Sequence, residues 1–141
     1  MKRILIIALL VASGQAFASG DANTDLAIAS MSGNFAMAQS ALKAGADPSR
    51  PADHAMTPLM FSVQSSNLDL VKLLLQSGAR VDAQDDQGWS AMMWAAALGR
   101  VQVIQLLLNY KASLALKSKT GETALSIAQS GEHPDTAIYL K

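Results

Sequence analysis

The chain has 141 residues, half of them hydrophobic, with 11 basic and 11 acidic side chains and no cysteine. A chain of this length forms one small domain. The charge balance argues against a nucleic-acid partner, which usually leaves a basic stripe on the protein. Because disulfides are excluded, apolar packing alone has to hold the domain together.

The first 18 residues have the pattern of a bacterial signal peptide. Lys2-Arg3 is a positive start, residues 4–11 form an unbroken apolar run, and Ala16-Phe17-Ala18 offers a small-x-small cleavage pattern. The alternative is a transmembrane anchor, but a spanning helix needs roughly 20 apolar residues and this run is shorter. We therefore expect export to the periplasm, cleavage after Ala18, and a mature domain of residues 19–141. Losing Lys2 and Arg3 leaves 9 basic against 11 acidic residues, a net charge of −2.

A period of 33 residues runs through the rest of the chain. Gly45-Ala46 recurs as Gly78-Ala79, and Leu74-Leu75 recurs as Leu107-Leu108. Three further series keep the same register: Thr24, Thr57, Ser90 and Thr123; Leu26, Leu59, Met92 and Leu125; and Ala29, Ser62, Ala95 and Ala128. Several independent positions in one register indicate a repeat architecture.

Each unit is predicted to consist of two short helices. In the second unit Thr57 is suited to cap the first helix, with Pro58 at the position where a missing N–H costs nothing. Asn67 or Asp69 starts the second helix, and Gly78 ends it in the left-handed conformation. The apolar stripe of that second helix consists of Leu68, Val71, Leu74 and Leu75. One helix pair cannot bury its own apolar face, so the pairs have to stack.

These units resemble the ankyrin repeat. The second carries Thr57-Pro58-Leu59 and the run from Leu74 to Ala79, the third carries Gly88, Ser90 and Met92, and the fourth carries Gly121, Thr123 and Leu125. The resemblance implies an all-α ankyrin-repeat solenoid of about four repeats, at about 22–49, 50–83, 84–116 and 117–141. The last repeat ends early, as a terminal cap would. The histidine that follows the leucine in the family is replaced by Met60, Met93 and Ser126.

Residues for catalysis or metal binding do not assemble in the sequence. His54 and His133 are the only histidines, and no third ligand stands at a recognisable spacing from them. Asp85 and Asp86 match the acidic turn position of the repeat, so we interpret them as a solvated turn and a local cap. We expect no catalytic residues, no metal and no cofactor. An enzyme remains the weaker alternative, and a closed pocket with converging polar groups would favour it.

The resemblance implies that a protein partner meets the concave side, made of the turn tips and the exposed faces of the first helices. Trp89 and Trp94 are the predicted anchors, because smaller residues at their positions serve the fold elsewhere and tryptophan is enriched in binding hot spots. The alternative places Trp94 between first helices as partial core. The predicted apolar neighbours are Met56, Phe61 and Leu98, and the predicted polar rim consists of Asp53, His54, Asp86, Gln87, Lys119 and Glu122. Ile28, Met31 and Ile127 take helix positions on the same side.

The function that follows is a binding module of the periplasm, monomeric when free, with a globular protein as partner. Nucleic acid is not expected as a partner, nor is a membrane once the signal peptide is removed. The preferred role is an inhibitor, of the kind that gives immunity to an exported enzyme such as a cell-wall hydrolase. The alternative is an accessory factor that supports a periplasmic enzyme, for example in oxidative defence.

Overall fold

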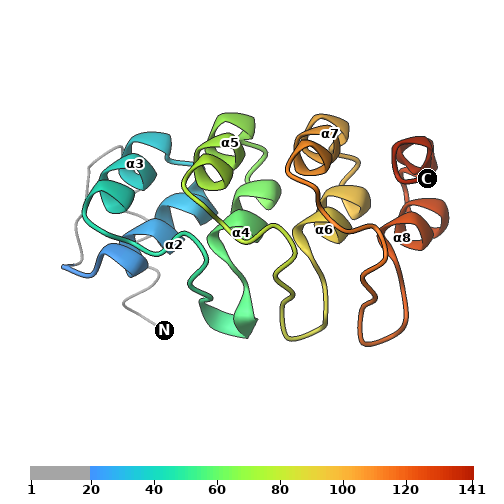
Figure 1. Ribbon diagram of the computed structural model, residues 1–141, viewed down its shortest axis with the longest axis horizontal. Helices are drawn as coiled ribbons and strands as arrows, with labels where there is room; N and C mark the ends of the chain where they lie inside the picture. The colour runs from blue at the N-terminus through green and yellow to red at the C-terminus, as the bar shows by residue number, and fades with distance from the viewer. Residues whose placement is uncertain (1–19) are drawn as a thin grey trace.

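The protein is a solenoid of helix pairs, seen in a computed structural model that describes residues 20–141 (Figure 1). The predicted signal peptide lies outside the described residues. The first helices of the four repeats form one layer: α2 (Ala22–Ser32), α4 (Pro58–Gln64), α6 (Ala91–Ala97) and α8 (Ala124–Ser130). The other layer contains α3 (Phe35–Lys43), α5 (Leu68–Gln76), α7 (Val101–Asn109) and the 3₁₀ helix η2 (Pro134–Tyr139). The predicted all-α class is confirmed.

In the second repeat, side-chain caps start both helices where the sequence predicts them. The Thr57 hydroxyl accepts a hydrogen bond from the Met60 N–H, with Pro58 at the first helical position. Of the two candidates for the start of α5, Asn67 is the cap. Its amide also donates to the Gly33 carbonyl oxygen at 2.8 Å, so one side chain starts a helix and joins two repeats.

The core lies between the two layers. Leu26, Leu59 and Met92 are at most 1% exposed, as are the small residues Ala29, Ser62, Ala95 and Ala128 that let first helices pack closely. In α5 the side chains of Leu70, Val71, Leu74 and Leu75 are buried. Leu68, predicted as part of this stripe, is only half-buried, because it is the first residue of the helix and lies at the edge of the packed surface.

Three turns project side by side from the layer of first helices (Figure 1). Each is closed by the same backbone hydrogen bond: Ala52 N–H to Met56 O, Asp85 N–H to Trp89 O, and Ser118 N–H to Glu122 O. Backbone hydrogen bonds also join neighbouring turns. The Asp86 N–H donates to the His54 carbonyl oxygen and the Lys119 N–H donates to the Gln87 carbonyl oxygen, each at 3.0 Å. The turns therefore form one continuous row along the molecule.

The first of these turns contains the short 3₁₀ helix η1 (Asp53–Ala55), in which Ala55 has a left-handed backbone with φ of 59°. Gly88 and Gly121 occupy the same register position with φ of 78° and 83°. An alanine in this conformation is strained by about 1–2 kcal/mol, whereas glycine adopts it freely. The second repeat therefore keeps a strained residue at a position where the others have glycine.

Replacing Ala55 by glycine should raise the free energy of unfolding by about 0.5–1 kcal/mol, because relief of strain outweighs the extra freedom of glycine in the unfolded chain. Urea denaturation measures the change. Ala52→Gly is the matched control, since Ala52 has φ of −102° and gains nothing from glycine. A loss of stability in both variants would contradict the left-handed assignment.

Candidate interaction surface

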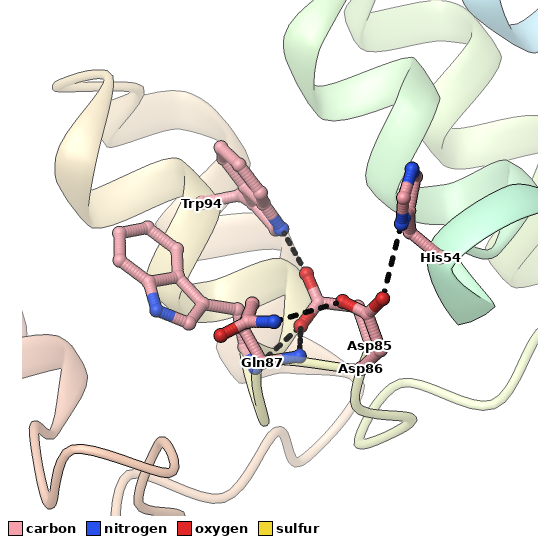
Figure 2. Close-up of polar contacts among 6 residues, drawn as sticks. His54, Asp85, Asp86, Gln87 and Trp94 are labelled. Atoms are coloured by element: carbon pink, nitrogen blue, oxygen red, sulfur yellow. Dashed lines mark hydrogen bonds and ion pairs between the residues drawn. The ribbon is translucent and has the colours of Figure 1, made fainter.

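The predicted tip residues lie on the row of turns, and the predicted helix residues lie beside it. We call the tips at residues 53–56, 86–89 and 119–122, with the adjoining surfaces of α2, α4 and α6, the turn face. At its centre His54 Nδ1 lies 3.1 Å from Asp86 Oδ2, and the two side chains are 80% and 42% exposed (Figure 2). The contact between them joins two neighbouring turns, in parallel with the backbone hydrogen bond between the same residues.

Asp85 determines the shape of the middle turn. Its Oδ1 accepts hydrogen bonds from the backbone N–H groups of Gln87 and Trp89, each at 2.9 Å. Its Oδ2 accepts one from the Trp94 indole Nε1 at 3.1 Å (Figure 2). The interpretation of Asp85 as a local cap is confirmed, because its carboxylate accepts hydrogen bonds from three donors. The expectation that Asp85 is solvated is wrong, because the residue is only 9% exposed.

The other turns differ from the middle one at the register position of Asp85. The register position of Asp85 is occupied by Ala52 in the second repeat and by Ser118 in the fourth. The Ser118 hydroxyl accepts a hydrogen bond from the Glu122 N–H at 3.1 Å, whereas alanine offers no acceptor. In the middle turn the Asp85 side chain connects the turn backbone to the first helix, because one oxygen accepts from the Trp89 N–H and the other from the Trp94 indole.

Trp89 and Trp94 form a tilted aromatic pair. Their ring centroids are 4.8 Å apart and their planes meet at 53°. Both are half-buried and pack against the hydrophobic core. The expectation that the fold has no use for them is therefore too simple, since each indole buries one part against the core and leaves another part on the surface. Such a pair has a packing role and still offers apolar area to a partner.

A groove opens on the same face between α2 and the turn of the second repeat. Its volume is about 490 Å³. Its apolar walls come from Ala27, Ile28, Met31, Pro51, Met56 and Phe61. Met56 and Phe61, predicted as neighbours of the tryptophans, belong to this groove. Arg50 and Pro51 also line the groove and were not predicted as site residues, although a proline next to a turn was a usable signal.

The fold and its repeats agree with what is found among known proteins. A family model of ankyrin repeats in three copies matches residues 3–85 and 59–141. The chain belongs to the ankyrin-repeat family. No curated protein matches it. Ankyrin repeats mediate binding to protein partners and are generally not enzymes, so this ankyrin-repeat protein is a protein-interaction module.

The remaining predicted partner-binding residues of the ankyrin-repeat protein differ in how exposed their side chains are and in whether these side chains are already hydrogen-bonded. Lys119 and Gln87 are exposed at their turn tips. Glu122 is half-buried and accepts a hydrogen bond from the Thr120 hydroxyl at 2.8 Å, so its carboxylate is used to close the last turn. Leu98 is half-buried at the end of α6. Asp53 is exposed beside the groove.

The prediction that Ile127 lies on the exposed side of α8 is wrong. The residue is 5% exposed and belongs to the hydrophobic core, where its apolar surface is removed from water. At the other end, Asp21 caps α2. Hydrogen bonds from the Thr24 hydroxyl and from the Asn23 N–H lower the pKa of its carboxyl group, which lines the groove.

Within residues 20–141 no three His, Cys, Asp or Glu side chains come together as metal ligands would. No helix of this part of the chain is long and apolar enough to cross a bilayer. The hollow of the turn face is lined mainly by apolar side chains, with charged groups at its rim. This arrangement suits the contact with a protein partner better than the positioning of a reacting group.

Proposed function

We propose that this ankyrin-repeat protein acts in the periplasm by binding a globular protein partner through the turn face. The observation that carries the proposal is the Trp89–Trp94 pair, held by Asp85 beside a row of joined turns. Half-buried indoles lose little conformational freedom when a partner covers them, so more of the contact energy appears as affinity. The exposed charges around them, among them Asp53 and Lys119, form a polar rim.

Trp89→Ala should weaken partner binding about 30-fold or more, because truncation of a central anchor typically costs about 2 kcal/mol. The partner is captured from a periplasmic extract with the mature chain as bait, and its affinity for each variant is measured by calorimetry. Because Trp89 is half-buried, we expect its loss to lower stability as well, by about 1–2 kcal/mol.

Gln105→Ala is the matched control, since Gln105 is exposed on α7 in the opposite layer and should leave the affinity unchanged. A Trp89→Ala protein that is folded at the measuring temperature and binds as tightly as the parent would contradict the proposed surface.

For the specific role we propose inhibition of an exported enzyme such as a cell-wall hydrolase, as an immunity-type protein. The candidate surface of residues 20–141 is the turn face, and covering the partner with this surface is the simplest action. Stoichiometric addition to the captured enzyme should abolish its activity. An enzyme that keeps its activity and survives heating longer would instead support the accessory role, of the kind useful in oxidative defence.

The location rests on the pattern of the first 18 residues. Expressed in a bacterium with its own leader, the protein should be recovered from the periplasmic fraction, and N-terminal sequencing should begin at Ser19. Sedimentation of this product should give a monomer. A full-length product that stays in the membrane fraction would contradict both the cleavage and the periplasmic assignment.

A further inference from the structure

The groove between α2 and the turn of the second repeat has a counterpart one repeat further along. The register position of Ile28 is occupied by Phe61 and then by Trp94, and that of Met56 is occupied by Trp89. Side chains at these positions thus become larger from the first repeat to the third. In the third repeat the two indoles pack on each other, with centroids 4.8 Å apart. The smaller side chains of the first two repeats leave a hollow of 490 Å³.

The hollow is apolar and partly open to water. Met31, on its wall, is 55% exposed, which makes it one of the most exposed large hydrophobic side chains of the described residues. Its volume lies in the range of about 300–1,000 Å³ that is usual for ligand sites. It therefore has room for one large side chain and the backbone that carries it. Burying such a side chain against Met31 and Phe61 removes apolar surface of both proteins from water.

The rim of the groove is acidic. Asp21 and Asp53 are the carboxylates of its lining, which also includes Arg50 and His54. The neighbouring His54 ring lies against Asp86, which adds a third carboxylate to this side of the turn face. Cationic groups of a partner are attracted to such a rim, and an acidic partner is repelled.

We propose that the groove receives an aromatic side chain from a loop of the protein partner, with a lysine or arginine next to it that meets Asp53. This proposal rests on the proposed function and specifies the chemistry that the partner presents. The aromatic ring occupies the space that Trp89 and Trp94 fill one repeat further along. The basic neighbour gives the loop its direction, because Asp53 lies on the turn side of the groove.

Three blocked pentapeptides test the proposal, with the central sequences Lys-Phe-Lys, Lys-Ala-Lys and Glu-Phe-Glu between glycines. Binding is followed by NMR of the protein with ¹³C-labelled methionine methyl groups. Lys-Phe-Lys should shift the signals of Met31 and Met56, which line the groove, and leave those of the buried Met60 and Met92 in place. It should bind about ten-fold or more tightly than either of the other peptides.

Two variants separate the aromatic and the basic part of the proposal. Ile28→Trp places in the first repeat the residue that stands at this position in the third, so it should fill the groove and abolish the shifts. Asp53→Lys, at an exposed position, should weaken the binding of Lys-Phe-Lys about five- to ten-fold and strengthen the binding of Glu-Phe-Glu, because it reverses one charge of the rim. Glu132→Lys, an exposed charge reversal outside the groove, should change neither affinity.

The outcomes also distinguish this proposal from the proposed function. A captured partner whose binding depends on Trp89 but is unaffected by Ile28→Trp would overturn the groove proposal and leave the turn face as the binding surface. Equal binding of Lys-Phe-Lys and Glu-Phe-Glu, or no shift of Met31 and Met56 with any peptide, would overturn it as well. If Ile28→Trp abolishes partner binding while the melting temperature stays that of the parent protein, the groove proposal is supported.

Discussion

Leu74→Ala should lower the free energy of unfolding by about 2–5 kcal/mol, the usual cost of truncating a buried leucine. Leu74 is fully buried in α5, in the middle of the solenoid, with helix pairs on both sides. Helix α5 contacts α3 and α7 of the two neighbouring repeats, so a disturbed α5 weakens the stack on both sides. Urea denaturation followed by circular dichroism measures the loss of stability.

Lys72→Ala is the control for the helix itself, because Lys72 is exposed on the same helix and alanine is a strong helix former. Its effect should stay within about 0.5 kcal/mol. Similar small effects in both variants would contradict the 33-residue register that places Leu74 in the core.

Asp85→Ala should lower the free energy of unfolding by about 2–4 kcal/mol, because each buried donor left without a partner costs about 1–3 kcal/mol and water will satisfy some of them. Three donors lose their acceptor: the N–H groups of Gln87 and Trp89 and the indole of Trp94. The tryptophan fluorescence should shift to the red as the pair becomes more exposed. Urea denaturation gives the stability change.

Asp86→Ala is the matched control, one residue away. The Asp86 carboxylate is 42% exposed and meets the His54 ring and the Gln87 amide near the surface, so its removal should cost less than about 1 kcal/mol. The loss of stability in Asp85→Asn should fall between those of Asp85→Ala and Asp86→Ala, because asparagine keeps one acceptor oxygen. Equal effects of the two alanine variants would mean that the buried carboxylate contributes no more than a surface charge.

The repeats, the helix starts and the fold class were predictable because they depend on short-range chemistry. Thr57 and Asn67 cap their helices with their own side chains, and Gly78, with φ of 93°, follows α5 in a conformation that favours glycine. The 33-residue spacing then aligns Leu59 with Met92 in one core, whatever the details of the turns. Interactions within a few residues and a fixed period are read directly from the chain.

The candidate site was only partly predictable, because its shape comes from contacts between residues that the period does not relate. The hydrogen bond from Trp94 to Asp85 crosses from a helix to a turn, and it joins a buried carboxylate to a half-buried indole. The groove arises where side chains of α2 meet the next turn, with no ring to fill the space between them. The sequence determines which repeat position carries an indole or a carboxylate. Burial and the available partners, which depend on the whole stack, decide whether it faces water, the core or a groove.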